Sequence, residues 1–263
     1  MATAIIAGLA VLPDVNIAVL DRNEAKRRAL SEAYHVTTLD VLPSAFDANT
    51  VVVLAVKPQQ LRELCIELAP RLHGALVLSV AAGIRVSALA RWLGGHQRIV
   101  RTMPNTPSQV GLGVTGMFAP AALDASDRER AARMMAAVGQ VIWVDEEAGL
   151  DAISAISGSG PAYVFYLIEA LALAAQRVGF DPATAQTLAF STFDGAIALA
   201  KHSGLPVATL RANVTSKKGS TEQAIACFDK EQLSERLIAG VLAAQARSLE
   251  MGTTLSQDDN NAH

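Results

Sequence analysis

The chain has 263 residues, of which 51% are hydrophobic, and its formal net charge at pH 7 is −3. This length supports one or two domains with a sizeable core. The nearly balanced charge, with no long run of one sign, disfavours nucleic acid and acidic membranes as partners. Cys65 and Cys227 lie outside any CxxC or Cys/His cluster, so we expect both to be reduced and no metal site to be present.

No apolar run stays uninterrupted over the roughly 18 to 20 residues that a membrane span needs. The nearest, from Ala162 to Gly179, contains Glu169, Gln176 and Arg177. The apolar start of the chain lacks the basic residues and the cleavage pattern of a signal peptide. These features predict a soluble, cytoplasmic protein.

The first half of the chain alternates short β-rich runs with helical patterns, which is the form of repeated βαβ units on a parallel sheet. Fully apolar runs suit central strands that are covered on both faces. The expected strands are 16–21, 50–56, 75–80, 98–103, 114–118 and 140–145, and apolar spacing predicts helices at 24–34, 59–72, 86–93 and 126–138.

From about residue 149 the β-branched runs nearly vanish and Ala/Leu-rich helices follow. We expect helices at 161–178, 182–202, 221–228 and 232–252. The first of them is apolar nearly all round, which is typical of a helix buried in a large core or a subunit interface. Because so small a domain offers little to cover it, we predict an all-helical domain that forms a homodimer or a larger assembly.

The beginning of the chain resembles part of a dinucleotide-binding domain. Such a domain opens with a strand, a glycine-rich turn and a helix whose N-terminus meets the pyrophosphate. Here an amphipathic helix starts at Met1, and a strand ending at Asp21 follows. We therefore interpret residues 1–148 as a Rossmann-like domain that lacks its first strand and Gly-rich loop, ahead of the helical domain at 149–263. A domain that simply starts with a helix is the alternative.

Residues at the expected carboxyl ends of strands are the candidates for cofactor binding, because parallel sheets bind ligands at that edge. Asp21 favours a ribose hydroxyl and NAD, whereas the basic residues after it suit a 2′-phosphate, and simple helix capping is an equal alternative. Small residues let a flat ring approach the backbone, and two prolines fix the loop around an Asn and a Thr. The candidates are Arg22, Asn23, Val56, Lys57, Pro58, Ala81, Ala82, Gly83, Asn105, Thr106 and Pro107.

The stretch from Leu210 to Ala224 is the most informative part of the sequence. Ser220 and Gln223 have capping-box spacing, which predicts a helix start with free backbone N–H groups. Hydroxyl residues gather around Gly219 there, and a helix dipole favours a carboxylate by roughly 0.3 to 1 kcal/mol. An ordinary capped loop would explain the box without explaining the hydroxyls. The sequence therefore predicts an anion site.

At these residues the sequence resembles the pyrroline-5-carboxylate reductase family. The resemblance is carried by residues 55–58, 81–83, 101–107, 157–163 and 213–221, and it covers the chain from Met1 to about Met251. It implies NAD(P)H-dependent reduction of 1-pyrroline-5-carboxylate to L-proline, the last step of proline biosynthesis. The cofactor would be NADPH, with NADH as the alternative.

The resemblance also implies the roles of single residues. Thr221 and Ser216 would be catalytic, and Asn213, Gly219 and Ser220 would bind the substrate at a dimer interface, while Asn105, Thr106 and Pro107 with residues 81–83 would frame the nicotinamide. The chain departs from the family at Lys217-Lys218, where Pro-Gly is usual, and in lacking the sequence Gly-x-Gly-Asn-Met-Ala. Two other functions stay open: a related imine or hydroxyacid reductase, and a non-catalytic or cofactor-impaired dimeric homologue. We expect weak cofactor binding, improved by a strand–Gly-x-Gly-x segment placed before Met1.

Overall fold

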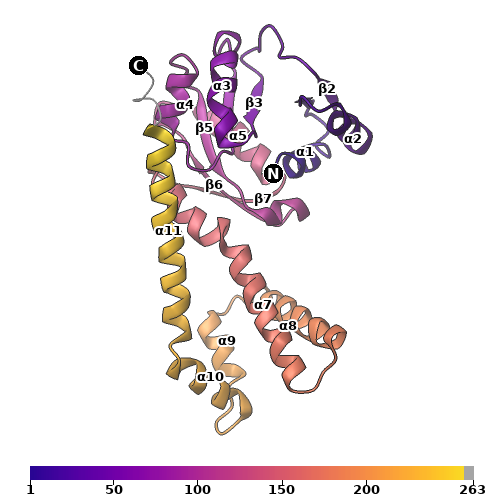
Figure 1. Cartoon of the computed structure of the whole chain (residues 1–263), viewed down its shortest axis with the longest axis vertical. Coiled ribbons are helices and arrows are strands. Elements are labelled where there is room, and N and C mark those ends of the chain that lie inside the picture. Colours follow the sequence, from indigo (N-terminus) through magenta and orange to yellow (C-terminus); the bar gives the residue numbers. More distant parts are fainter. Residues whose placement is uncertain (258–263) are drawn as a thin grey trace. The chain divides into compact units, whose positions relative to one another are not determined.

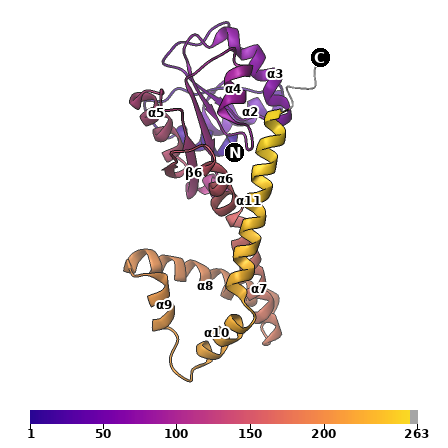
Figure 2. The ribbon, with the colours of Figure 1, turned by 90° about the vertical axis from the view of Figure 1, so that its left-hand side faces the viewer.

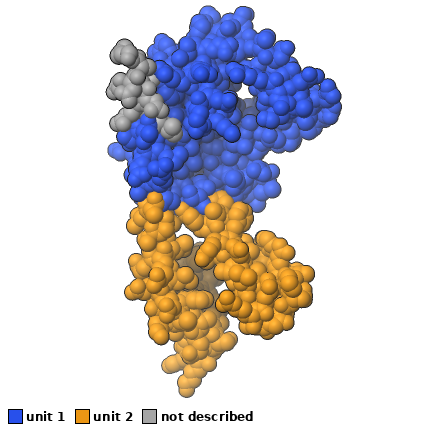
Figure 3. All heavy atoms as spheres, in the orientation of Figure 1, with its two compact units in different colours: residues 1–159, 244–263 blue, residues 160–243 orange. Residues whose placement is uncertain are grey.

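The computed structural model describes residues 1–257. The chain forms two compact units (Figure 3): unit 1 contains residues 1–159 and the chain from Ala244 onward, and unit 2 contains Gly160–Ala243. The last helix, α11 (Leu233–Gln257), contributes to both units. These units reflect packing, and the functional boundary between residues 148 and 149 stays a prediction.

Unit 1 holds two sheets. The smaller pairs β1 (Ala18–Leu20) with β2 (Thr37–Leu39), and β2 was not expected from the sequence. The larger has the order β3-β4-β5-β6-β7. Its strands are β3 (Val51–Leu54), β4 (Leu76–Ser79), β5 (Ile99–Met103), β6 (Gly113–Phe118) and β7 (Gly139–Trp143).

The prediction of a wholly parallel sheet is wrong at one pair, because β5 and β6 run antiparallel. Only the short segment that contains η2 (Thr106–Val110) connects these two strands. A parallel pair needs a crossover of a dozen or more residues. The short connection therefore reverses the chain direction at this point of the sheet.

The strands of unit 1 are divided into two sheets at the place where a Rossmann domain has its first strand. In a Rossmann domain the strand order is 3-2-1-4-5-6. Here β1 pairs with β2 in one sheet, and β3, β4 and β5 are successive neighbours in the other, as in that order without its first strand. No strand precedes α1 (Ala2–Leu9) in the described chain. An opening through unit 1 is visible at this place, between β3 and the region of α2 (Glu24–Tyr34) (Figures 1 and 3).

Helices cover both faces of the five-stranded sheet, and Figure 2 shows α5 on the opposite side from α3 and α4. On one face α3 (Pro58–Leu68), followed by the short turn η1 (Ala69–Arg71), and α4 (Val86–Trp92) bury Leu61, Cys65 and Leu89. On the other face α1 and α5 (Ala125–Ala136) bury Ile5, Leu9 and Met135 against β4, β5 and β6. The central strands β4 and β5 are therefore buried on both faces, as their apolar sequences predict.

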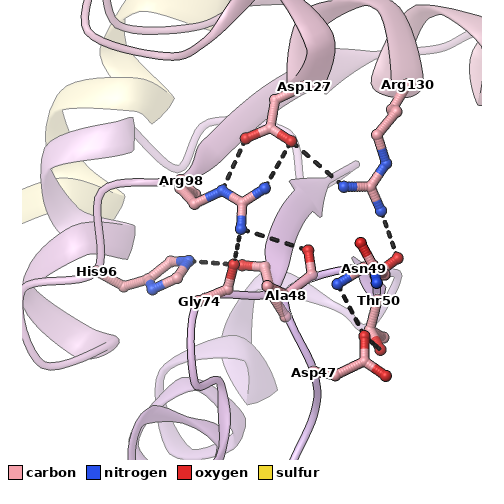
Figure 4. A network of polar contacts seen from close by, with 10 residues as sticks. Asp47, Ala48, Asn49, Thr50, Gly74, His96, Arg98, Asp127 and Arg130 are labelled. Carbon is pink, nitrogen blue, oxygen red and sulfur yellow. Dashed lines mark hydrogen bonds and ion pairs between the residues drawn. The ribbon is translucent and has the colours of Figure 1, made fainter.

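An ionic network ties together the amino ends of the strands (Figure 4). Arg98, just before β5, donates two hydrogen bonds of 2.7 Å to the carboxylate of Asp127 on α5. Arg98 also donates to the carbonyl of Gly74, and Arg130 donates to the carbonyl of Asn49. The Arg98 guanidinium lowers the pKa of Asp127, which is almost fully buried. This network lies at the edge opposite the loops that bind ligands in such folds, so its role is structural.

Unit 2 is wholly helical, as expected. It contains α7 (Gly160–Arg177), α8 (Pro182–Ser203), α9 (Val207–Asn213), α10 (Ser220–Lys230) and the first part of α11. Asp181 caps α8 by accepting hydrogen bonds from the N–H groups of Ala183 and Thr184, and Pro182 occupies the first turn. The helix α9 was not expected from the sequence.

Much of the apolar surface of unit 2 is exposed within the single chain. Only Ala185 and Ala189 are buried between residues 160 and 243. The exposed side chains include Phe165, Tyr166, Leu173, Phe190, Ile197, Leu237, Ile238 and Leu242. The expected apolar helix α7 therefore forms with only partial cover from its own chain, which α8 provides.

One long helical stretch differs from the expectation on membrane spans. Gly149–Arg177 joins α6 (Gly149–Ile153), the π-helical turn η3 (Ser154–Gly158) and α7, and by length and composition it is able to cross a membrane. The polar residues that interrupt it are too few to exclude a span on this criterion. An apolar helix that packs against a second copy of the chain meets the same criterion, so the run by itself does not indicate a membrane.

Candidate functional site

Three candidate loops lie at one edge of the sheet, because β3, β4 and β5 are parallel neighbours. After β3, Val56 and Lys57 lead into α3, with Pro58 in its first turn. After β4, Ala81 and Gly83 are buried, and Gly83 adopts a φ of 79°, which an L-residue with a side chain rarely takes. After β5 comes the loop of Asn105. The structure therefore brings together the candidates of residues 56–58, 81–83 and 105–107.

The Asn105 loop is fixed by its own side chain. The Asn105 amide donates to the carbonyl of Ser157 at 2.9 Å and accepts from the N–H of Val114 at 2.8 Å. Asn105 is buried, whereas Thr106 next to it is exposed. Because the amide of Asn105 is engaged at both ends, this residue shapes the loop, and Thr106 is the side chain that faces solvent.

The residues after β1 serve mainly as caps within the chain. Asp21 accepts from the N–H of Asn23 at 2.8 Å, and Asn23 accepts from the N–H of Lys26 at 3.1 Å at the start of α2. Arg22 is exposed and makes no ion pair or hydrogen bond with residues 1–257. Of these residues, Arg22 is therefore the one available to pair with a 2′-phosphate.

A cavity of about 340 Å³ lies at the N-terminus of α1, lined by Met1, Thr3, Ala4, Ala7, Tyr34 and Gln109. Gln109 belongs to η2, which follows the Asn105 loop and packs against α1. Met1 gives α1 no side-chain cap, so the first N–H groups of the helix have no helical partner. A helix N-terminus beside a cavity fits the pyrophosphate of a dinucleotide. The described residues thus fit parts of such a cofactor, although among them no Gly-x-Gly turn leads from a strand into α1.

A second ionic network, which the sequence reasoning missed, supports this side of unit 1. Arg101 on β5 lies 3.0 Å from the Glu147 carboxylate, and Arg85 lies 2.6 Å from the carboxylate of Asp151 on α6. Ser248 on α11 donates to Asp151 at 3.3 Å. Burial lowers the pKa of Arg101. The only sequence signal was an arginine within an apolar strand.

In unit 2, the predicted substrate residues meet in one turn between α9 and α10, which we call the substrate turn (Ser216–Ser220). Asn213 is the last residue of α9. Gly219 donates its N–H to the carbonyl of Ser216 at 3.0 Å, and a Cβ on Gly219 would lie 2.5 Å from the Ser216 hydroxyl oxygen. Thr221 is the second residue of α10 and is half-buried, while Ser216 and Ser220 are exposed.

The predicted capping box is displaced by one residue. Gly219, not Ser220, is the N-cap of α10 and has no side chain with which to cap it. Glu222, three residues later, accepts a hydrogen bond of 2.7 Å from the N–H of Lys218. The reach-back typical of a capping box is thus made by Glu222, to the residue before the cap. The sequence reasoning chose the pair with a hydroxyl at the cap, but glycine also begins helices.

A Rossmann-like α/β unit with a helical unit defines the class of dinucleotide-dependent oxidoreductases with two domains. Residues 147–251 match the family described as "Pyrroline-5-carboxylate reductase dimerisation", and residues 1–83 match "NADP oxidoreductase coenzyme F420-dependent". The pyrroline-5-carboxylate reductase of Vibrio alginolyticus is 41% identical, with 95% of this chain and 94% of the relative covered. That of Pseudomonas aeruginosa is 37% identical, with 98% and 95% covered. The chain belongs to the pyrroline-5-carboxylate reductase family.

Solved structures agree with this membership. A pyrroline-5-carboxylate reductase from Coxiella burnetii is 40% identical and superposes with a TM-score of 0.87, covering 95% of this chain and 94% of the other. The pyrroline carboxylate reductase of Plasmodium falciparum, with NADP bound, is 26% identical with a TM-score of 0.79, and 96% of each chain is covered.

Proposed function

We propose that the chain reduces 1-pyrroline-5-carboxylate to L-proline with NAD(P)H, the last step of proline biosynthesis. The observation that carries this proposal is the identity of 41% to a pyrroline-5-carboxylate reductase over 95% of the chain. Two features of the structure support it: the small-residue loops at the carboxyl edge of β3, β4 and β5, and the hydroxyl-rich turn before α10.

The reaction requires the protein to orient the imine carbon against the nicotinamide and to provide a path for a proton to the ring nitrogen. When bound, the nicotinamide supplies the hydride that adds to the imine carbon. Residues 81–83 with Thr106 and Pro107 would frame its ring, and Arg22 would favour NADPH over NADH. The other cofactor contacts that we propose are Asn23, Val56, Lys57 and Pro58, with Asn105 holding its loop in place.

The substrate would be held at the substrate turn. The first N–H groups of α10 have no helical partner, and they suit the substrate carboxylate. The Thr221 hydroxyl would donate to the ring nitrogen, which gains a proton as the carbon gains the hydride. Ser216, Gly219 and Ser220 complete the contacts, and Asn213 supports the turn from the end of α9.

Self-association follows from the match of residues 147–251 to the dimerisation family and from the exposed apolar side chains of unit 2. We propose a homodimer or a larger assembly, with residues 149–263 forming the dimerisation and substrate domain. We also propose a soluble, cytoplasmic protein that binds neither nucleic acid nor membrane, in keeping with its charge of −3.

An assay of the purified chain with 1-pyrroline-5-carboxylate, using NADPH and NADH in turn, tests this function. A panel of other cyclic imines and 2-oxo acids distinguishes a related reductase. We expect the five-membered imino acid to give the highest kcat/KM. Faster turnover of a 2-oxo acid, or the same kcat/KM for an imine without the carboxylate, would contradict the proposal.

The strength of cofactor binding is a separate proposal, supported by the divided sheet. Among residues 1–257, β1 and β3 belong to separate sheets, and no strand-to-helix turn presents amides to the pyrophosphate ahead of α1. We therefore expect weak binding of NADPH. Calorimetric titration of this chain, and of the chain extended by a strand–Gly-x-Gly-x segment before Met1, compares the two directly. Equal and tight affinities would contradict this expectation.

A further inference from the structure

The substrate turn contains a residue in a conformation that its side chain disfavours. Lys218 has a φ of 61°, in the left-handed region that glycine adopts readily and lysine rarely. It stands directly before Gly219, the N-cap of α10. Something in the chain must therefore hold the backbone of Lys218 in place.

We infer that Glu222 is a positioning residue that holds this turn in its left-handed form and so aims the first N–H groups of α10 at the substrate carboxylate. The inference rests on the proposed function. Glu222 Oε2 accepts a hydrogen bond of 2.7 Å from the Lys218 N–H. A hydrogen bond to a carboxylate is about twice as strong as a neutral one. Glu222 is half-buried, and it is the side chain that binds the backbone at the strained residue.

The backbone conformation of Lys218 sets the direction in which the backbone N–H groups after it point. The Gly219 N–H is already used by the Ser216 carbonyl. The N–H groups of Ser220 and Thr221 lie in the first turn of α10, where no helical carbonyl is available to them. A change of φ at Lys218 would move these two groups together, while the helix itself would persist.

The charge of Glu222 requires an explanation, because a carboxylate beside an anion site repels the anion. Lys217 and Lys218 are exposed, and their ammonium groups form no ion pair with the described residues. These two cations offset the charge of Glu222 at the turn. Glu222 is therefore needed as a hydrogen-bond acceptor, and its negative charge serves to strengthen that bond.

Three variants separate these roles. Glu222→Ala removes the acceptor, Glu222→Gln keeps an acceptor without the charge, and Lys218→Gly removes the strain. We expect Glu222→Ala to raise the KM for 1-pyrroline-5-carboxylate about tenfold, as for the loss of one hydrogen bond to a charged group, with kcat changed less than threefold. Glu222→Gln, whose neutral bond is about half as strong, should raise the KM only about threefold. Adding Lys218→Gly to Glu222→Ala should restore the KM, because glycine adopts a φ of 61° without strain.

Glu235→Ala is the matched control, since Glu235 is also an acidic residue in the first turn of a helix, but of α11 and not of α10. Its KM should equal that of the parent chain. An unchanged KM in Glu222→Ala, or a failure of Lys218→Gly to rescue it, would overturn the inference.

Amide hydrogen exchange of residues 214–222 tests the same device without any turnover. Exchange should be faster in Glu222→Ala and return to the parent rate in the double variant. If the parent chain proved inactive, the proposed function would fail while the exchange result still decided the role of Glu222. Equal exchange in Glu222→Ala and the parent would overturn that role whatever the activity.

Discussion

Unit 1 and unit 2 differ in where their apolar side chains are buried. In unit 1 the sheet is covered on both faces by helices of the same chain, and Leu61, Leu89 and Met135 are inaccessible to solvent. Between residues 160 and 243 only Ala185 and Ala189 are buried, although the helices are equally regular. The five-stranded sheet of unit 1 is thus covered within one chain. The helices of unit 2 leave many large apolar side chains exposed within the single chain, which is typical of a protein interface.

The largest effect expected from this comparison is loss of assembly. Phe165 and Tyr166 on α7 are 62% and 71% exposed within one chain. If a second copy covers them, Phe165→Glu with Tyr166→Glu buries two charges at the interface and should convert the oligomer to a monomer. Light scattering measures the change against the chain mass of 27.6 kDa.

Val41→Glu is the matched control, because Val41 is 71% exposed in unit 1. Its mass in solution should be that of the parent oligomer. A parent chain that is already a monomer at micromolar concentration would contradict the proposed interface.

The next largest expected effect is a lower rate of substrate reduction with the fold unchanged. Thr221→Ala removes one hydroxyl from a half-buried position at the start of α10. Loss of one positioned donor costs on the order of 10²-fold in rate. We expect kcat to fall by about this factor at an unchanged melting temperature, and steady-state kinetics with thermal unfolding measure both. A variant with the parent rate would reject Thr221 as a catalytic residue.

In unit 1 the corresponding prediction is a loss of stability at distance from the site. Asp127→Ala leaves Arg98 without its bidentate partner. Because Arg98 keeps part of its surface in water, we expect a loss of about 2 kcal/mol, below that of a fully buried pair. Urea unfolding measures it. Arg133→Ala, which breaks the exposed pair with Asp14, is the control and should leave the midpoint unchanged.

Periodicity and composition predicted most helices and strands of both units, because these elements carry apolar residues at a clear helical or strand spacing. The strand β2 (Thr37–Leu39) and the helix α9 (Val207–Asn213) were missed because they are short and carry little periodic signal. The strand β6 runs antiparallel to β5 because the connection between them is short. The apolar pattern of a strand carries no information on its direction. The network of Arg101 and Asp151 was missed because its members are far apart in the sequence and only folding brings them together.

The candidate site was predictable as a set of loops but not as a set of side-chain roles. Asn105 was expected to frame the nicotinamide, and its amide in fact joins the Ser157 carbonyl to the Val114 N–H. The sequence does not reveal which polar side chains are already engaged by the backbone. For the same reason Glu222, with no hydroxyl and no place in the family motif, gave no signal before its bond to Lys218 was seen.

The smallest expected effect is a dependence of unit 1 on pH through His96. The ring Nε2 lies 2.8 Å from the Ala75 carbonyl, and burial lowers the pKa of His96 below its ordinary value of about 6.5. The folded chain therefore favours the neutral ring. The stability that this contributes is present above pH 6.5 and is lost as the pH falls through the lower, folded pKa. We expect the urea midpoint to fall between pH 7 and pH 5, and to fall less in His96→Gln.

His202→Gln, which changes an exposed histidine on α8 in unit 2, is the control and should keep the parent's dependence of the urea midpoint on pH. An identical fall in the parent and in His96→Gln would assign the dependence to other groups.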